Sequence, residues 1–429
     1  MNIARLNTAC RTQPASRKIL VASLAVAAIT LAASRVTAQA TPADSLADRL
    51  RRAEAAIRSL QQQVADQAES SARTRSGMHL ELSGRVMVAG FGNSRRVNNV
   101  DNPQFVRPDT VATVPVRGIG MAIRQTRVGL AVRSSSVLNG SFTGDVDVDF
   151  YGGQQPSSGG RTFPLIRMRT ARAVVRWTHA HLMIGQESPL VSGVNPESPV
   201  AIGTPEFAGA GNLWLWLPQI RGGVESGGRV RFGVDAAVLA PTSGDAVAAF
   251  DTDYDLAERS QRPYLQARAH AAWGADVSRG EIGCGVHQGW LMPGASRVTS
   301  NAVACDVTAP LAGGVDVRGE FFTGQALRGL GGGGIGQNFD PGSAALSTTG
   351  GWAQVNWRPS GLTEMGAGCG TDQPDALAAR RRNDACSTYA TVRPAGPLFF
   401  GAEWRRLRTG YAAAHFTNDH VTLAAGFEF

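Results

Sequence analysis

Charged residues that could select ions occupy every second position in several short stretches of the chain. Asp145, Asp147 and Asp149 alternate with valines in DVDVDF, and acidic and basic residues alternate with apolar ones in VDVRGEF, 315–321. Successive side chains of a β-strand point to opposite faces, so the charges of each stretch share one face. Rows of fixed charge attract ions of opposite sign and exclude others, which is ion-selective binding rather than bond-making chemistry.

The motifs that usually mark a reactive site are incomplete in this chain. GGGGIG, 331–336, lacks the Lys-Ser/Thr pair of a phosphate-binding loop. DVDVDFYGGQQP resembles a calcium loop, but Phe150 stands at its glycine position and Pro156 at its bidentate glutamate position. The nucleophile-elbow pattern G-x-S-x-G does not occur. We therefore predict no enzyme activity, with no catalytic residue, metal ion or cofactor.

The charged positions belong to segments of about ten alternating residues that recur from Met78 to the C-terminus. Sixteen segments are predicted as strands, an even number that is typical of single-chain bacterial barrels. They lie near 78–91, 121–133, 140–151, 166–178, 181–187, 214–225, 228–239, 262–274, 279–290, 298–308, 314–323, 349–358, 361–370, 384–393, 397–408 and 416–429.

The connections between these segments alternate between short and long. SSSVLN, THA, SGG, DVSRG, PLAGG, PSG and PAGP are short, whereas those around 92–120, 152–165, 188–213, 240–261, 324–348, 371–383 and 409–415 are long. The connection 291–297 is the exception. Short turns on one rim and long loops on the other are typical of the periplasmic and extracellular ends of a membrane barrel.

Alternation alone fits a soluble β-sandwich as well as a membrane barrel. The high strand count and a polar face dense in both signs of charge favour the barrel, in which that face lines a water-filled lumen. Aromatic residues at strand ends fit girdles at the membrane surfaces. They are Trp177, Trp273, Trp290, Trp357, Phe399, Phe400, Phe427 and Phe429. The predicted fold is all-β, a 16-stranded antiparallel transmembrane β-barrel over 78–429.

The N-terminal segment has the pattern of a secretory signal peptide. Arg17 and Lys18 precede the apolar run 19–34, and Ala38-Gln39-Ala40 is a cleavage pattern, so residues 1–40 are predicted to be removed. The alternative, a membrane anchor, needs about 20 apolar residues, more than the run supplies. Removing the five basic residues of 1–40 leaves 37 basic against 34 acidic residues, a net charge of +3 with no lysine. This balance predicts no nucleic-acid partner.

A short α-helical coiled coil is predicted to precede the barrel. Leu46, Leu50, Ala53, Ile57, Leu60 and Val64 form a heptad seam within 41–70, and 71–77 is a linker. Three heptads are too short to be stable alone, so the segment needs an attached oligomer. The alternative is an amphipathic helix that lies on its own domain.

The C-terminal strand VTLAAGFEF, the sixteen segments and the long connection after the fifth strand resemble general bacterial outer-membrane porins. The heptads resemble the DcaP-like branch, whose members carry a periplasmic N-terminal coil and form trimers. The resemblance implies a homo-oligomer, a trimer, surrounded by outer-membrane lipid in the bacterial cell outer membrane. It also implies that Phe427 and Phe429 are an assembly signal read by the barrel-assembly machinery.

In porins the connection after the fifth strand folds into the lumen, so the resemblance implies a constriction loop over 187–212. This loop carries acidic residues and no basic ones. Arginines of strands one, two and four face it, together with aspartates of strand three. The predicted pore-constriction residues are Arg85, Arg127, Arg133, Arg167, Arg169, Asp145, Asp147, Glu187, Glu197 and Glu206. The alternative is that the arginines pair with the aspartates and only fill the wall.

Strand four breaks the alternation. Arg167 and Arg169 fall on one face, whereas Arg172 and Arg176 fall on the other. A β-bulge near Thr170 brings all four to the same face. Without a bulge, two of them lie at the rim.

The four cysteines that follow the signal peptide form two pairs, each centred on a predicted hairpin connection. Cys284 and Cys305 flank 291–297, and Cys369 and Cys386 flank 371–384. An exported protein can form disulfides, so we predict both bridges; the alternative is four packed thiols.

The function predicted from these features is passive diffusion of small hydrophilic solutes, with a mild preference for anions such as small carboxylates or phosphate. Arginine binds both groups through two parallel hydrogen bonds. Two other functions remain open at this point: a barrel enzyme such as an outer-membrane lipase or protease, and a structural or adhesive barrel with a plugged lumen.

Overall fold

The computed structural model describes residues 72–73, 78–109, 117–152, 164–245, 253–274 and 278–429. The predicted signal peptide and coiled coil lie outside these residues. Within the predicted linker, β1 (Ala72–Arg73) pairs with the first residues of the next strand. Among the described residues, no helix is long and apolar enough to cross a membrane.

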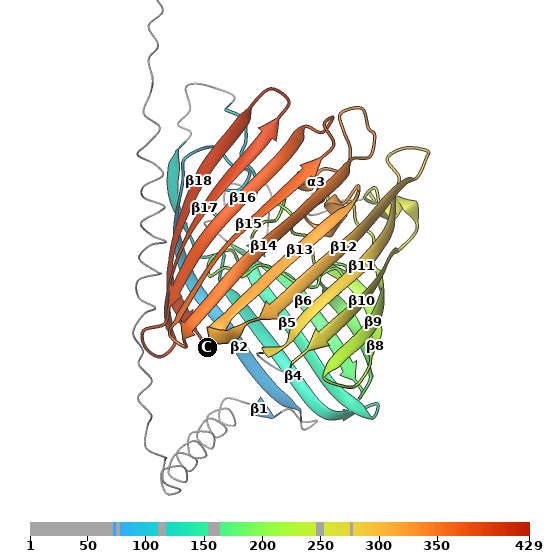
Figure 1. Ribbon diagram of the computed structural model, residues 1–429, viewed down its shortest axis with the longest axis vertical. Coiled ribbons are helices and arrows are strands. Elements are labelled where there is room, and N and C mark those ends of the chain that lie inside the picture. The colour runs from blue at the N-terminus through green and yellow to red at the C-terminus, as the bar shows by residue number, and fades with distance from the viewer. Residues whose placement is uncertain (1–71, 74–77, 110–116, 153–163, 246–252, 275–277) are drawn as a thin grey trace, which may run out of the picture. The chain divides into compact units, whose positions relative to one another are not determined.

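The described part of the chain consists of strands joined by connections that contain a few very short helices (Figure 1). The remaining strands are β2 (His79–Asn93), β3 (Gly118–Ala122), β4 (Arg127–Val137), β5 (Gly140–Gly152), β6 (Leu165–Arg176), β7 (Ala180–Glu187), β8 (Leu217–Glu225), β9 (Val230–Leu239), β10 (Tyr264–Trp273), β11 (Gly280–Leu291), β12 (Val298–Pro310), β13 (Val315–Gln325), β14 (Ser347–Ser360), β15 (Thr363–Pro374), β16 (Arg380–Val392), β17 (Leu398–Tyr411) and β18 (His415–Glu428). The helices are η1 (Glu258–Ser260), η3 (Ala312–Gly314), η4 (Arg328–Leu330) and α3 (Gly333–Gly336).

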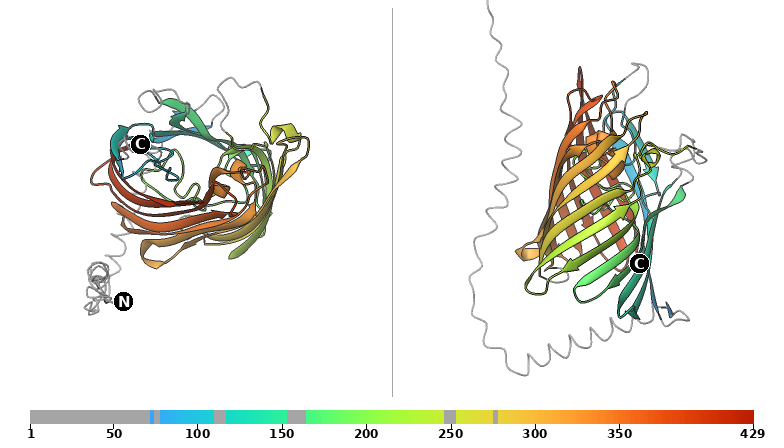
Figure 2. Two further views of the ribbon diagram at one scale, coloured as in Figure 1. Left: turned by 90° about the horizontal axis from the view of Figure 1, so that it is seen from above. Right: turned by 90° about the vertical axis from the view of Figure 1, so that its right-hand side faces the viewer.

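The strands close into a barrel. Each strand from β4 to β18 pairs antiparallel with the next, and β18 pairs with β2 from His420↔Asn93 to Glu428↔Arg85. The first half of β2 pairs with β4 and the second half with β3, so β3 and β4 occupy one position in the ring. Eighteen strands, less β1 and with β3 and β4 counted once, give the sixteen positions that the alternating segments predict. Figure 2 shows the ring in the view from above.

The second barrel strand is interrupted, contrary to the continuous strand predicted over 121–133. The break at 123–126 turns Arg124 onto Asp101, where two hydrogen bonds join them, and over the ring of Tyr151 at 3.8 Å. The adjacent Gln125 is buried and accepts hydrogen bonds from the inner loop described below. The polar side chains of the break therefore form hydrogen bonds inside the barrel instead of continuing the strand.

The two faces of the wall differ as the alternation predicts. Phe232 and Phe321 are 66% and 55% exposed on the outward face, whereas Asp235 and Asp316 on the same strands are buried on the inward face. All strands that the structure describes belong to one closed sheet, and no second sheet in this part of the chain covers the apolar face, so the sandwich alternative does not apply. Phe399 is a correction to the predicted aromatic girdle, because it is fully buried inside the barrel.

Apolar contacts inside the barrel lie where the connection 188–216 touches the wall. One cluster joins Leu190 and Leu213 of this connection to Tyr264 and Phe322 of the wall. Gly211 has a φ of +104°, and a Cβ there would lie 2.2 Å from the carbonyl oxygen of Gly351. The close approach of the two backbones therefore requires glycine at this position.

Candidate functional site

The connection 188–216, called the inner loop below, crosses the barrel interior and is hydrogen-bonded to several strands. The Gln266 side chain accepts hydrogen bonds from the amides of Leu190 and Val191, at 2.6 and 3.3 Å. The Gln354 side chain bonds both the amide and the carbonyl of Glu197, at 2.7 and 2.8 Å. Because these partners come from β10 and β14, the inner loop is fixed along a path through the lumen.

The far part of the inner loop is held by a buried network on β16 and β17. Arg405 lies 2.7 Å from Glu403 and 3.3 Å from Glu206, and Ser387 donates to Glu206 at 2.9 Å. Burial, together with the nearby Glu403, raises the pKa of Glu206 well above its ordinary range. Glu206 has no exposed surface, so it anchors the loop. The sequence predicted instead that Glu206 faces the open lumen as a constriction residue.

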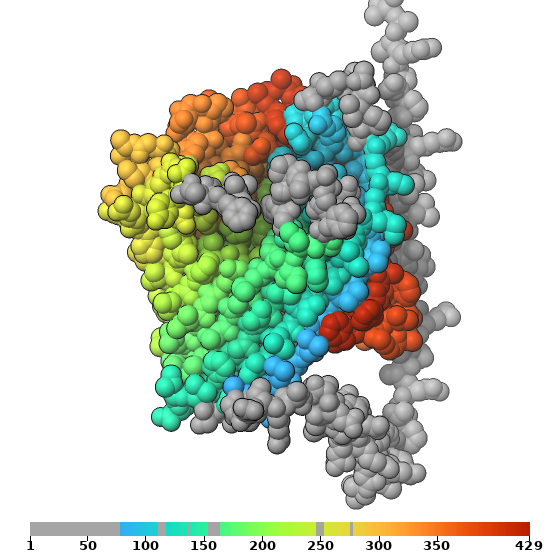
Figure 3. All heavy atoms as spheres, turned by 180° about the vertical axis from the view of Figure 1, so that it is seen from behind, coloured from blue at the N-terminus to red at the C-terminus, as the bar shows by residue number. Residues whose placement is uncertain are grey.

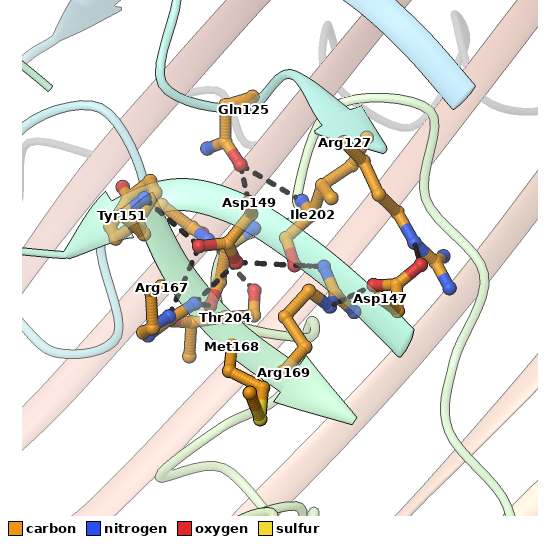
Figure 4. A network of polar contacts seen from close by, with 12 residues as sticks. Gln125, Arg127, Asp147, Asp149, Tyr151, Arg167, Met168, Arg169, Ile202 and Thr204 are labelled. Carbon is orange, nitrogen blue, oxygen red and sulfur yellow. Dashed lines mark hydrogen bonds and ion pairs between the residues drawn. The ribbon is translucent and has the colours of Figure 1, made fainter. Parts of the chain in front are cut away.

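The aspartates of β5 and the arginines of β4 and β6 form a charged wall (Figure 4). Asp147 lies 2.5 Å from Arg127 and 3.2 Å from Arg169, and Asp149 lies 2.6 Å from Arg167. The sequence left two roles open for these arginines, facing the lumen or pairing with the aspartates of the wall, and the structure shows that the role differs from one arginine to another. Asp149 is fully buried and Arg167 is its direct partner, whereas Arg127 keeps 48% of its side chain exposed.

A register shift on β6 brings its arginines to one side of the wall. Asp147 pairs with Thr170, but Val148 pairs with Met168, so Arg169 is the extra residue of a bulge. Arg172, beyond the bulge, then reaches Asp145 at 3.0 Å and also forms an ion pair with Glu187. The bulge lies beside Thr170, so of the two alternatives that the sequence left open the bulge is the one observed. Glu187 lies at the end of β7, so it belongs to the wall and does not face the arginines from across the lumen.

Arg85 and Arg133 lie at different heights. Arg85 donates to the Pro199 carbonyl at 3.0 Å, forms an ion pair with Glu428 and lies over the Phe399 ring. Arg133 is 65% exposed and lies 3.2 Å from Glu81, six residues beyond Arg127 on β4. Arg85 therefore contacts the inner loop, and Arg133 lies towards the rim of the short turns.

Glu197 of the inner loop is paired with arginines that sequence reasoning did not select. It forms ion pairs with Arg318 of β13 and Arg358 of β14. Burial raises the pKa of Glu197 to about 7, although both arginines act to lower it. The alternation in VDVRGEF indicates that Arg318 faces inward, but its height relative to the loop depends on strand register.

A cavity of about 430 Å³ lies between the inner loop and the wall. Its charged lining residues are Arg85, Arg127, Arg169, Arg318, Arg393, Glu197 and Glu364. Five guanidinium groups against two carboxylates leave a net charge of +3 when both carboxylates are ionised. Of the predicted constriction residues, the structure thus brings Arg85, Arg127, Arg169 and Glu197 together around one polar space.

The remaining selected residues lie on the outward face. Cys284 is bonded to Cys305 and Cys369 to Cys386, each pair directly opposite across neighbouring strands with Cα atoms 4.0 Å apart. Phe427 and Phe429 are 42% and 48% exposed, with ring centroids 6.0 Å apart. Among the described residues, no group of His, Cys, Asp and Glu could hold a metal ion.

Comparison with solved structures finds the same fold in known outer-membrane channels. The outer-membrane channel DcaP of Acinetobacter baumannii matches with a TM-score of 0.63 and 15% identity, covering 84% of this chain and 100% of DcaP. The chain has the porin fold. An anion-selective porin from Comamonas acidovorans matches with a TM-score of 0.52 and 9% identity, over 82% of this chain and 100% of that porin. Salmonella typhi OmpF, in a complex with daunomycin, matches with a TM-score of 0.51 and 11% identity, over 84% of this chain and 100% of OmpF.

These matches come from comparing structures and not from comparing sequences. No protein-family model matches the sequence, and no curated protein matches it either. In a barrel wall only the alternation of apolar and polar residues is dictated by lipid and water, so the identity of most residues can change without loss of fold.

Proposed function

We propose that this chain is a bacterial outer-membrane porin, a channel for passive diffusion of small hydrophilic solutes. The proposal is supported by the closed barrel with an apolar outward face and a charged inward face. A 16-stranded barrel is wide enough for an aqueous channel, and the solved structures with the same fold are channels. The long loops then face outside, and the short turns face the periplasm.

The preference that we propose is for anions. The observation that carries it is the cavity between the inner loop and the wall, whose charged groups sum to +3. Guanidinium groups bind carboxylate and phosphate through paired hydrogen bonds, so small carboxylates or phosphate are the proposed solutes. A porin from Comamonas acidovorans with the same fold is anion-selective.

The constriction that we propose is 187–212, which consists of Glu187 at the end of β7 and most of the inner loop. Arg85, Arg127 and Arg169 face solute from the wall, and Glu197 does so from the loop. The other selected charges have structural roles in this proposal. Arg167 holds Asp149, Arg172 holds Asp145 and Glu187, and Glu206 anchors the loop to Arg405.

The assembly that we propose is a trimer held in part by the N-terminal coil of 41–70, after removal of 1–40. In this proposal Phe427 and Phe429 face lipid and direct insertion by the barrel-assembly machinery. Both rings are exposed, which suits contact with lipid and recognition by the barrel-assembly machinery.

Liposome swelling tests the proposed channel directly. Purified protein in liposomes is challenged with uncharged, anionic and cationic solutes of similar size. We expect all small solutes to enter, with a small dicarboxylate faster than a diamine of equal length. Liposomes that do not swell in any of these solutes would refute a channel, whereas swelling that is equal for both charges would refute only the anion preference.

A further inference from the structure

The two disulfide bridges lie on the outward face of the barrel, in two different hairpins. One joins Cys284 of β11 to Cys305 of β12, and the other joins Cys369 of β15 to Cys386 of β16. Both hairpins are on the side that faces the viewer in Figure 1, whereas the opposite side, seen in Figure 3, is formed mainly by earlier strands. The proposed channel uses neither bridge, and the two bridges differ in what surrounds them.

The bridge between Cys284 and Cys305 is surrounded by apolar side chains. Ala269 of β10 lies opposite Cys284, and Phe321 of β13 lies opposite Cys305. The next outward residues on β11 and β12 are Ile282, Val286, Val303 and Val307. An apolar band of this kind is the part of a barrel wall that meets hydrocarbon.

The bridge between Cys369 and Cys386 lies beside charged side chains instead. Cys386 is directly opposite Arg406 of β17, whose side chain is 58% exposed. One outward position further along the hairpin, Thr371 donates a hydrogen bond to Asp384 at 2.8 Å. Arginine on the lipid face of a barrel is costly at the bilayer midplane and tolerated near the surface. The second bridge therefore lies near the membrane surface, and the first lies deeper in the apolar band.

Thiol–disulfide exchange needs water around the sulfur atoms. The attacking group is a thiolate, and its charge is poorly solvated in hydrocarbon. A water-soluble oxidase also cannot contact sulfur atoms that lie inside a bilayer. Once β11 and β12 belong to the wall, Cys284 and Cys305 are therefore out of reach of exchange.

The first hairpin can bring its cysteines together before the barrel forms. Cys284 and Cys305 are 21 residues apart in sequence and directly opposite in the register of β11 and β12. Even the shortest wrong loop, between Cys305 and Cys369, is about three times as long, so loop closure favours the native partner. The bridge also fixes the register, since a slip by one residue would put the two cysteines on different faces.

We propose that a dithiol oxidase of the periplasm joins Cys284 to Cys305 before the barrel inserts into the membrane. Cys369 and Cys386 remain open to exchange after insertion. In each oxidation a sulfur–sulfur bond forms between the two cysteines, and the disulfide of the oxidase breaks. The two electrons and two protons of the cysteine thiols pass to the two thiols of the oxidase. The inference rests on the outer-membrane location of the barrel and not on conduction.

The test adds the oxidant at two different times. Protein purified from outer membranes is reduced and unfolded in urea, and is then diluted into phosphatidylcholine bicelles, in which both membrane faces are open to solution. A purified bacterial dithiol oxidase in its disulfide form is added either before the bicelles or after heat-modifiable migration shows that insertion is complete. The remaining thiols are alkylated in denaturant, and each cysteine is counted by peptide mass spectrometry.

Two double variants, each of which keeps one pair, are matched controls for each other. They are Cys369→Ser/Cys386→Ser and Cys284→Ser/Cys305→Ser. When the oxidase is added first, we expect both pairs to form bridges. When it is added after insertion, Cys369 should join Cys386 faster than Cys284 joins Cys305, by about tenfold or more, because only the deeper pair must form a thiolate in hydrocarbon.

The reverse reaction is a second measurement that does not require the reduced chain to insert. A water-soluble phosphine is added to the native, bridged protein in bicelles. It should reduce the bridge between Cys369 and Cys386 about tenfold faster or more than the bridge between Cys284 and Cys305, because water reaches only the first of these. In urea the two bridges should be reduced at similar rates.

Equal rates for the two pairs in the membrane, in either direction, would overturn the proposal. A pair Cys284/Cys305 that forms its bridge only after insertion, or that stays reduced whenever the oxidase is added, would overturn it as well. A reduced chain that fails to insert, while the variant that keeps only this pair inserts once it is oxidised, supports the proposal. Conductance is recorded on the same samples, so a barrel without conductance would contradict the proposed function and leave this inference standing.

Discussion

Replacing Arg127 by glutamine should reduce the preference of the channel for anions. Arg127 lines the polar cavity with 48% of its side chain exposed, and the substitution lowers the charge of the cavity lining from +3 to +2. Asp147 keeps Arg169 as a partner at 3.2 Å, so the wall retains an ion pair at this position. The variant therefore changes the field in the lumen with little change in structure.

The size of the effect follows from the dimensions of the cavity. A space of about 430 Å³ places an ion at its centre about 6 Å from the guanidinium of Arg127. Two unit charges at about 6 Å in water interact by about 0.7 kcal/mol, and screening at about 0.1 M salt reduces this to about 0.4 kcal/mol. Entry of an anion then falls about twofold and that of a cation rises about twofold, so the permeability ratio falls about fourfold.

The assay is the zero-current potential of the channel in a planar bilayer under a salt gradient. Arg133→Gln is the matched control, because Arg133 is on the same strand but does not line the cavity. Six residues separate it from Arg127, about 20 Å along a strand, which is about two Debye lengths. An Arg127→Gln channel whose potential equals that of the native protein, or a shift of equal size in Arg133→Gln, would refute the reasoning.

Three further predictions follow from other parts of the structure. Because the pKa of Glu197 is raised to about 7, lowering the pH from 8 to 6 (about one unit either side) should protonate this carboxyl, raise the positive charge of the cavity and increase anion preference. The Glu197→Gln variant should be anion-selective to the same degree at both pH values. If that variant still responds to pH as the native protein does, Glu197 is not the titrating group. The double variant Cys369→Ser/Cys386→Ser should lose about 3 kcal/mol of stability, because the disulfide closes a short chain loop in the unfolded state. The loss is measured as a lower temperature at which the folded band is lost in heat-modifiable migration, with the chemically reduced native protein as the comparison. The same temperature with and without the bridge would contradict the prediction. Phe429→Ala should lower the yield of folded barrel in the outer membrane while leaving refolding from urea into detergent unchanged, and equal loss in both would indicate a packing role for the ring that contacts Gly84.

The barrel could be predicted from sequence because the strands present an apolar face outward and a charged face inward. The alternation of Asp145, Asp147 and Asp149 with valines is the pattern expected of a barrel wall between water and lipid. The bulge near Thr170 was one of two alternatives that the alternation allowed, since without it Arg172 and Arg176 would fall on the other face and lie at the rim. These are local consequences of residue type and period.

The charged lining was only partly predictable, because it depends on how far strands are shifted against each other. Arg318 and Glu197 are far apart in sequence, and their contact requires both the register of β13 and the path of the inner loop. The break at 123–126 was missed because its cause, Gln125 holding the amides of Ile202 and Gly203, also lies in the loop path. Phe399 was placed outside because the period gives alternate faces but not which residue of a strand end lies inward.

The central claim is that the charged face of this barrel encloses a continuous aqueous path that prefers anions. Single-channel recording of the purified full-length protein in a planar bilayer, with small organic anions and cations as the only charge carriers, tests it most directly. The account predicts stepwise conductance in both salts and larger steps when the organic ion is the anion. A barrel that inserts, folds and gives no steps in any salt would contradict it.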